Sequence, residues 1–257
     1  MNILFKREDG FHEIETAMLE IPFSDELELH EASIDSFETE GLEIPGSGNL
    51  VTDAVHLLRK NFVFSPVAIR LKKMVPMGGG LGGGSSDAAF TLKAINEQMN
   101  LGLSTAQLEN YAAQLGSDCS FFIKGGLQLC TGRGEITQPL SIDLPKLHLL
   151  IVNIGIHVPT KTAYSKVIPS KDKPAISSIL QMPIEEWQGK LVNDFEVSVF
   201  NAHPELAEIK TDLLKNGAVY AAMSGSGSTM FGLFHQLPSS IQFSHTPVYE
   251  KWVQIGA

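Results

Sequence analysis

The sequence predicts an α+β fold, and three observations support this class. Strand-like stretches with alternating side chains precede and separate segments that have helical spacing. The helical segments carry recognisable capping residues at their ends. No regular alternation of strand and helix surrounds the glycine-rich segment at 76–86, so a doubly wound parallel sheet is not expected.

Four strands are expected along the chain. Residues 13–19 are strand-like and residues 26–31 alternate strictly, so both are predicted to be half-exposed antiparallel strands. Apolar residues also alternate through 67–73, which predicts a strand leading into the glycines. The apolar run at 147–156 is too short to span a membrane and contains Asn153, so we expect a buried strand there.

Four helices are expected from spacing and end signals. The first covers residues 50–59, and the second is predicted to begin after the glycines, with N-cap oxygens from residues 85–87. A capping box at 104–107 opens the third, which should stop at Gly116. Pro204 opens the fourth, and Asn216-Gly217 closes it.

Composition excludes several classes of function. The chain has 257 residues with 19 Lys and Arg against 29 Asp and Glu, and this net charge of −10 disfavours nucleic acid as a partner. Its 43% hydrophobic and 19% charged residues are typical of a globular protein. Cys119 and Cys130 form no CxxC pair, so no disulfide scaffold or zinc site is expected. Charge at Lys6 comes too early for a signal peptide, so we expect a cytoplasmic protein that does not associate with membranes.

The segment 76–86 is the most unusual feature of the chain. It holds six glycines, more than a turn requires. Because it lies between a strand and a helix N-terminus, its N–H groups and the helix dipole would favour an anion, and phosphate is the expected ligand. A flexible linker or a tight contact between helix and sheet is the structural alternative.

Two known phosphate motifs fit this segment poorly. The Walker loop requires a Gly-Lys-Ser/Thr ending, which is absent. Gly78, Gly80 and Gly83 satisfy the dinucleotide fingerprint, but a run of glycines satisfies almost any glycine spacing. Glu97 is a weak candidate for the acidic residue that would bind a ribose. A dehydrogenase is therefore not expected.

The segment resembles the phosphate loop of the GHMP kinase superfamily, whose form is Pro-x-Gly-x-Gly-Leu-Gly-Ser/Gly-Ser-Ser. Three further segments, 7–12, 115–122 and 223–228, resemble the branch of that superfamily that phosphorylates a cytidine-diphosphate-bearing sugar alcohol on the non-mevalonate route to isoprenoids. The residues that match the phosphate loop are Pro76, Met77, Gly78, Gly79, Gly80, Leu81, Gly82, Gly83, Gly84, Ser85 and Ser86.

The resemblance implies a two-lobed GHMP kinase fold with the active site in the cleft between the lobes. The lobe boundary is placed so that residues 1–145 form the N-terminal lobe and residues 146–257 the C-terminal lobe. ATP with magnesium is the implied cofactor, and a small molecule with a cytidine diphosphate group is the implied substrate. A monomer or a weak homodimer is expected.

Asp118 is the residue to which the resemblance assigns catalysis. Phosphorylation of an alcohol requires a group that removes or orients the hydroxyl proton, while N–H donors stabilise the charge on the phosphoryl oxygens. Asp118 would supply the carboxylate, and the 78–86 loop the donors. Without the resemblance, Asp118 could equally be a turn residue at the end of a helix.

The resemblance also assigns substrate and nucleotide contacts. Flat bases require a stacking face and polar groups at their edge, which an aromatic residue and a histidine provide. Structural alternatives exist for these residues. Phe11 could be a core residue, His12 and Thr160 could be turn residues, and Lys73 could be a solvated charge. The segment 224–228 could be a simple hairpin turn. By match, Phe11, His12 and Tyr164 would bind the cytosine, with Thr160 near the substrate. Asn49 and Lys73 would line the adenine pocket, and Ser85 and Ser86 would contact the phosphates or magnesium. Ser224, Gly225 and Gly227 belong to the second glycine-rich loop.

One family feature is absent from this sequence. The family begins with a strand of the form Ala-Lys-Ile-Asn-Leu, of which the chain retains only Asn2-Ile3-Leu4-Phe5. That Lys would lower the pKa of the catalytic Asp. Two alternatives stay open. One is another GHMP small-molecule kinase, of the homoserine or mevalonate type; the other, suggested by the missing Lys strand, is a remnant that binds ATP without turnover.

Overall fold

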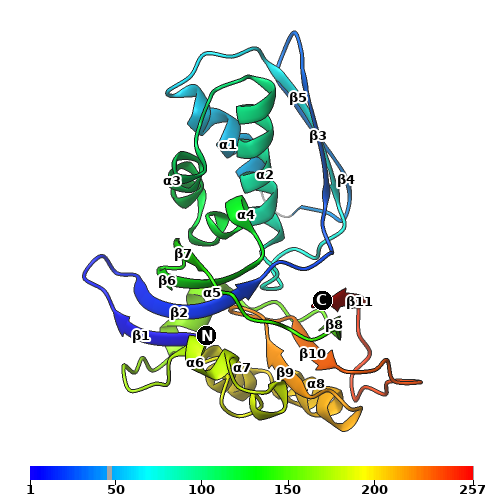
Figure 1. Cartoon of the computed structure of the whole chain (residues 1–257). Helices are drawn as coiled ribbons and strands as arrows, with labels where there is room; N and C mark the ends of the chain where they lie inside the picture. The colour runs from blue at the N-terminus through cyan, green and yellow to red at the C-terminus, as the bar shows by residue number, and fades with distance from the viewer. Residues whose placement is uncertain (45–47, 257) are drawn as a thin grey trace. The chain divides into compact units, whose positions relative to one another are not determined.

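The computed structural model describes residues 1–44 and 48–256, and the chain divides into two compact units (Figure 1). Unit 1 comprises Met1–Ala17, Gly78–Leu81 and Gln138–Ala257, and unit 2 comprises Met18–Met77 and Gly82–Thr137. The glycine-rich segment therefore contributes residues to both units. The two units interleave along the chain, and the lobe boundary near residue 145 stays a prediction.

Unit 2 has a three-stranded sheet covered by helices. Its strands are β3 (Glu26–Glu31), β4 (Ser36–Gly41) and β5 (Val67–Lys73), in the order β3-β5-β4, with β3 antiparallel and β4 parallel to β5. Figure 1 shows helices on one side of this sheet. They are α1 (Leu50–Arg59), α2 (Gly83–Gln98), α3 (Thr105–Leu115) and α4 (Phe121–Lys124), with the 3-10 turn η1 (Ser117–Cys119) between the last two.

The core of unit 2 follows from the spacing of its apolar residues. Val67, Ile69 and Leu71 point to the helices because they alternate along β5. On α2, Ala88, Leu92 and Ile95 are fully buried, and small Ala88 lets the helix approach its neighbours closely. Each large buried side chain of this kind stabilises the fold by about 1.5–3 kcal/mol relative to its exposed form, so the apolar face places α2 firmly.

Unit 1 has an antiparallel sheet of its own, in the order β11-β8-β10-β9. Its strands are β8 (Leu147–Asn153), β9 (Tyr220–Met223), β10 (Met230–Phe234) and β11 (Tyr249–Ile255). Its helical elements are α5 (Thr160–Lys166), α6 (Ile176–Leu180), the 3-10 turn η2 (Ile184–Glu186), α7 (Phe195–Ala202) and α8 (Pro204–Lys215).

The remaining strands form another four-stranded sheet. Strand β1 (Asn2–Lys6) pairs antiparallel with β2 (His12–Leu19), and the strand order is β1-β2-β6-β7. Strands β6 (Leu127–Gly132) and β7 (Ile136–Pro139) complete it. The turn between β1 and β2 carries Phe11, which the sequence assigns to the substrate.

Most of the expected elements are confirmed, including α1, the capping box at Ser104 and the stop of α3 at Gly116. Two corrections are needed. Helix α2 begins at Gly83 with Gly82 as its N-cap, so residues 85–87 lie inside the helix and do not cap it. Strand β4 is one of the elements that the sequence does not predict, because it has the charged sequence SFETEG and a non-local parallel partner. Strands β6, β7 and β11 and helices α4 to α7 are also additions to the expected elements. In the described part of the chain, no helix is long and apolar enough to cross a membrane.

Candidate active site

The N-terminus of α2 is an uncapped helix end. Gly82 occupies the N-cap position with φ +70° and no side chain accepts a hydrogen bond from the first turn. The first helical hydrogen bond of this end runs from the N–H of Ser86 to the carbonyl of Gly82, at 2.9 Å. Backbone N–H groups of the first turn therefore point out of the helix with the positive end of its dipole, which is the arrangement that binds phosphate.

The glycines before α2 are required by close neighbours as well as by backbone conformation. Gly80 has φ +80°, and a Cβ atom there would collide with the carbonyl oxygen of Ser224. A Cβ at Gly82 would lie 2.9 Å from the ring of Phe122. At both positions the backbone therefore approaches protein atoms closely. The same absence of side chains leaves the N–H groups accessible.

The loop between β9 and β10 packs against part of the glycine-rich segment within unit 1. Ser224 Oγ donates to the carbonyl of Gly80 at 2.8 Å, and the Thr229 N–H donates to the carbonyl of Gly79 at 3.0 Å. The hairpin expected at 224–228 is thus present. The hydrogen bonds to two consecutive carbonyls fix the loop backbone, whereas the roles of Ser224, Gly225 and Gly227 toward a substrate stay predictions.

A buried ion cluster anchors the strand that enters the glycine-rich segment. Lys73 is fully buried, and its Nζ donates to Asp87 Oδ2 at 2.8 Å and to Asp25 Oδ2. Asp25 Oδ1 also accepts the N–H groups of Met74 and Val75, at 2.5 and 2.8 Å. One cation therefore ties together the end of β5, the segment around Asp25 and the N-terminal part of α2.

The solvated-charge interpretation of Lys73 is wrong, because position 73 continues the buried series of residues 67, 69 and 71. Its ammonium group is held by two carboxylates, and its assignment to the adenine pocket stays a prediction. Burial, opposed by the charge of Lys73, raises the pKa of Asp87 to about 6. Asp87 therefore stabilises the fold most below its ordinary pKa of 3.8, and this contribution is lost as the pH rises through about 6.

Asn49, the other residue assigned to the adenine pocket, caps α1. Its Oδ1 accepts the N–H of Val51 at 2.8 Å, in the geometry of an N-cap. A cap of this kind is worth about 1 kcal/mol, so Asn49 has a structural reason to be present. Its contact with adenine is not tested by the structure and stays a prediction.

Asp118 lies in the turn η1, directly after Gly116 ends α3. Solvent reaches its side chain, but the protein atoms around the carboxyl desolvate it and raise its pKa above the ordinary 3.8. A raised pKa makes the carboxylate a stronger base. Burial raises the pKa of the neighbouring Cys119 thiol to about 11, against the effect of a hydrogen bond with Ser85, so this thiol is not a nucleophile. Asp118 and Ser85, from the first turn of α2, thus both influence Cys119.

In unit 1, His12 and Tyr164 lie against each other, and their contact with a cytosine stays a prediction. Their rings stack with centroids 5.1 Å apart and planes 27° apart, and Tyr164 meets the edge of Phe195 at 4.8 Å. Burial, together with the charge of Lys6, lowers the pKa of His12 below 6.5, which favours the neutral ring. A neutral imidazole offers one donor and one acceptor to the edge of a base. Phe11 follows the turn with its ring half exposed.

Thr160 begins α5 and lies beside the hairpin loop. Its hydroxyl forms a hydrogen bond with Ser226 Oγ at 3.1 Å. Nearby in the same segment, the ring of His157 lies against Gly78, because a Cβ atom added at Gly78 would be 3.3 Å from it. Sequence reasoning missed Asp25, Ser226 and His157, since each meets its partner far along the chain.

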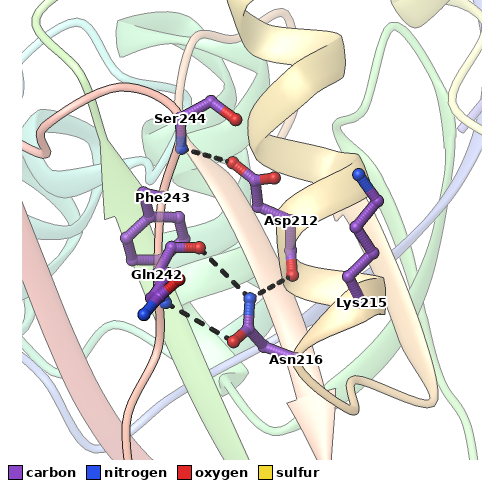
Figure 2. A pocket seen from close by; sticks show the side chains of 6 residues that line it. All are labelled: Asp212, Lys215, Asn216, Gln242, Phe243 and Ser244. Carbon is purple, nitrogen blue, oxygen red and sulfur yellow. Dashed lines mark hydrogen bonds between the residues drawn. The ribbon is translucent and has the colours of Figure 1, made fainter.

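A separate hollow of ≈ 370 Å³ lies beside α8 (Figure 2). In it, Asp212 accepts the N–H of Ser244 at 2.6 Å, and the Asn216 side chain donates to the carbonyl of Gln242 at 3.2 Å. These polar groups attach the following segment to the helix and are occupied by that task. No predicted site residue lines this hollow. Among residues 1–44 and 48–256, no group of three His, Cys, Asp or Glu side chains could hold a metal ion.

Two family models match separate parts of the chain. The model of the GHMP kinases N terminal domain matches residues 49–126, and that of the GHMP kinases C terminal matches residues 182–244. Solved GHMP-type structures share the fold: a homoserine kinase from Cytophaga hutchinsonii has a TM-score of 0.61 at 19% identity and covers 87% of this chain and 78% of its own. At this identity, the likeness shows the fold alone.

Closer relatives carry one name. A 4-diphosphocytidyl-2-C-methyl-D-erythritol kinase from Cytophaga hutchinsonii is 44% identical over 93% of this chain and 90% of its own length. Its counterpart from Bacteroides fragilis is 45% identical over 91% of this chain and 88% of its own. A crystal structure of a 4-(cytidine 5'-diphospho)-2C-methyl-D-erythritol kinase has a TM-score of 0.76 at 33% identity and covers 90% of this chain and 85% of its own.

Fold and loop place the chain among the GHMP kinases, which use ATP as phosphate donor. Within that class, it belongs to the family of 4-diphosphocytidyl-2-C-methyl-D-erythritol kinases.

Replacing Lys73 should test the buried ion cluster. Lys73→Met leaves two carboxylates buried without their cation, so we expect the free energy of unfolding to fall by about 3–5 kcal/mol in urea titrations. The deficit should shrink as the pH falls toward 5, because Asp87 then takes up a proton. Lys72→Met is the matched control, since its ion pair with Glu26 is exposed and should be worth about 0–1 kcal/mol. Equal losses for the two variants would contradict the anchoring role.

Replacing Gly80 should test the close approach in the loop. Gly80→Ala should weaken ATP binding at least about tenfold, because the new Cβ displaces the loop backbone from Ser224 and so disturbs the donors after it. Gly102→Ala is the control: Gly102 has φ +71° with open space around it, so only a backbone cost of about 1–2 kcal/mol arises. Calorimetric titration with ATP measures the affinity of the two variants, and the Gly102 variant should bind ATP like wild type. Unchanged ATP affinity in the Gly80 variant would count against the loop as the phosphate site.

Proposed function

We propose that this chain transfers the γ-phosphoryl group of ATP to the 2-hydroxyl of 4-diphosphocytidyl-2-C-methyl-D-erythritol, in the non-mevalonate route to isoprenoid precursors. The observation that carries the proposal is the 44% identity to a kinase of that name over nine-tenths of both chains. Homoserine and mevalonate kinases share the fold at under 20% identity, which does not favour their substrates.

The chemistry assigned to this chain is an in-line transfer between two oxygens. Asp118 accepts the proton of the 2-hydroxyl while the hydroxyl oxygen forms a bond to the γ-phosphorus of ATP. The bond between the γ-phosphorus and the β–γ bridging oxygen breaks, and ADP leaves with that oxygen. The raised pKa of Asp118 supports this role, since a stronger base takes the proton more readily. N–H groups at the start of α2 would stabilise the charge that develops on the phosphoryl oxygens.

Magnesium would accompany the nucleotide. Mg²⁺ keeps several waters and takes few protein ligands when phosphates are present, so a site without an acidic cluster among the described residues still fits it. Ser85 and Ser86, in the first turn of α2, are the hydroxyls that we assign to the phosphates or the ion. The metal would neutralise charge between the β- and γ-phosphates.

Cytosine recognition would fall to unit 1. The stacked pair of His12 and Tyr164 offers polar atoms at an aromatic surface, and Phe11 adds a half-exposed ring. Thr160 would lie near the substrate, beside Ser226. We further propose a cytoplasmic enzyme without a nucleic-acid partner, in keeping with the net charge of −10. Its state as a monomer or weak homodimer stays a prediction.

Turnover with competing substrates tests the function. We expect ATP-dependent phosphorylation of 4-diphosphocytidyl-2-C-methyl-D-erythritol, with homoserine and mevalonate as much poorer acceptors. Asp118→Asn should lower kcat by about 10²–10⁴-fold while ATP still binds, because the amide cannot accept the proton. Near-wild-type turnover of this variant would remove Asp118 from the mechanism. ATP binding with no acceptor phosphorylated by the wild type would favour the non-catalytic alternative.

The pH profile of turnover gives a second test. Asp118 must be ionised to act as a base, so kcat should fall as the pH is lowered through its pKa, which lies above 3.8. Stopped assays from pH 4 to 9 would reveal this acidic limb. In Asp118→Asn the residual rate should lose the limb; if it persisted unchanged, another group would be titrating.

A further inference from the structure

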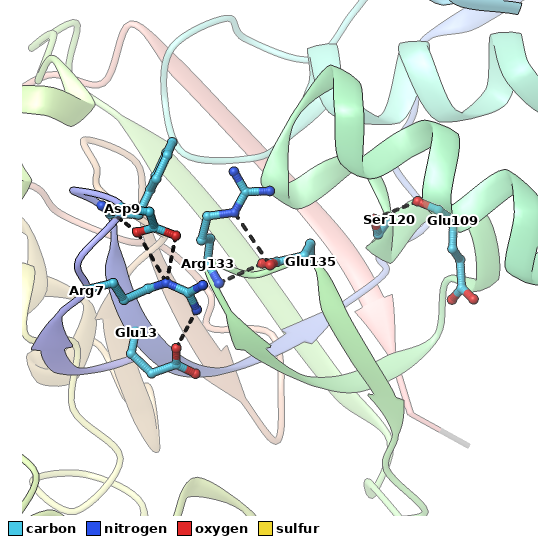
Figure 3. Close-up of polar contacts among 8 residues, drawn as sticks. Arg7, Asp9, Glu13, Glu109, Ser120, Arg133 and Glu135 are labelled. Carbon is cyan, nitrogen blue, oxygen red and sulfur yellow. Dashed lines mark hydrogen bonds and ion pairs between the residues drawn. The ribbon is translucent and has the colours of Figure 1, made fainter.

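The Arg7 side chain links the two ends of the turn between β1 and β2. Figure 3 shows Arg7 between two carboxylates. Its Nε donates to Asp9 Oδ1 and Oδ2 at 3.3 and 3.1 Å, and its Nη1 donates to Glu13 Oε2 at 2.7 Å. Asp9 and Glu13 flank Phe11 and His12 in the sequence. A single guanidinium therefore grips the chain on both sides of the two residues assigned to the cytosine.

Main-chain hydrogen bonds close this turn, and one side-chain contact ties it to the Arg7 guanidinium through Asp9. Arg7 N–H donates to the carbonyl of Phe11 at 2.8 Å, and Gly10, with φ +86°, donates to the carbonyl of Arg7 at 3.2 Å. Asp9 Oδ1 accepts the N–H of Phe11 at 3.1 Å. The carboxylate that Arg7 orients thus directly fixes the backbone of Phe11. Phe11 is 50% exposed, so burial restrains this residue less than it would a core residue.

We infer that Arg7 is a positioning residue that pre-forms the turn carrying Phe11 and His12 for the cytosine of the substrate. This inference rests on the proposed function. Arg7 acts through its two carboxylate partners and need not touch the substrate. Without it, the turn would have to be ordered when the substrate binds, and that ordering costs binding free energy.

The guanidinium is suited to this task in a way that an ammonium is not. Its planar fork can serve Asp9 with one N–H and Glu13 with another in fixed relative directions. A lysine has the same charge but a flexible stem, and it would engage the two carboxylates without fixing their geometry. The comparison of Arg7→Gln with Arg7→Lys therefore separates geometry from charge.

Steady-state kinetics test the inference in the full-length protein. Arg7→Gln should raise KM for the cytidyl substrate about tenfold, with kcat and the KM for ATP changed less than about twofold. Arg7→Lys should recover only part of the loss. Arg70→Gln is the matched control: it removes the same charge from an exposed pair with Glu40 and should leave all three parameters unchanged.

A measurement without substrate separates this inference from the proposed function. Amide hydrogen exchange of the Phe11 N–H, followed by NMR in the ligand-free protein, should be at least about tenfold faster in Arg7→Gln than in wild type, while amides of the β8 strand stay protected. Affinity for cytidine 5'-diphosphate, measured by calorimetry, should fall about tenfold in parallel.

The outcomes are distinct. If wild type fails to phosphorylate the cytidyl substrate, the proposed function falls, whereas the exchange rate still decides whether Arg7 orders the turn. Unchanged Phe11 exchange and unchanged substrate KM in Arg7→Gln would overturn the inference. A second result would also overturn it: Arg7→Lys restores the wild-type substrate KM, and the rise in KM in Arg7→Gln disappears at high salt. Arg7 would then act only as a charge.

Discussion

The uncapped N-terminus of α2 is the constraint on which the rest of the site depends. Its N–H groups would be available to phosphates because Gly82 supplies no side chain to satisfy them. A free helix end must be held in place by contacts elsewhere, and the cluster of Lys73, Asp25 and Asp87 does this from inside unit 2. Burying the Lys73 ammonium and its carboxylate partners costs desolvation free energy. The cluster fixes the position of the helix start, so its main effect is on geometry and its net contribution to stability is smaller.

The glycines satisfy two demands with the same property. Lacking side chains, they let the carbonyl of Ser224 and the ring of Phe122 approach. These contacts oppose the large gain in backbone conformational entropy that a glycine-rich loop has on unfolding. Rigidity matters because a loop that binds phosphates must aim its N–H groups before the charge develops. In unit 1, Arg7 and the ring pair of His12 and Tyr164 would play the corresponding part for the base under the proposed function. Both ligands would then meet residues that are already ordered.

Local patterns are predictable from this sequence, and contacts between distant segments are not. The capping box at Ser104 is recognisable because its residues lie within one turn of each other. The start of α2 is misplaced because Ser85 looks like a cap, whereas a glycine in a left-handed conformation begins the helix. The solvated-charge interpretation of Lys73 is wrong because it rests on the charge of the side chain alone. The alternation of buried residues along 67–73 places the same side chain in the interior. The glycine-rich loop is recognised from residues alone, but the partners of its backbone, at Ser224 and Thr229, come from a hairpin more than 140 residues later.

The central claim, that the first turn of α2 holds the phosphates of ATP, can be tested on individual amides. NMR titration of the ¹⁵N-labelled protein with Mg-ATP follows the backbone N–H groups of residues 82–86 directly. The account predicts large shifts and slowed exchange for these amides, with small changes in the last turn of the same helix, near Gln98. Saturating ATP that leaves residues 82–86 unchanged, while shifting amides elsewhere, would contradict it.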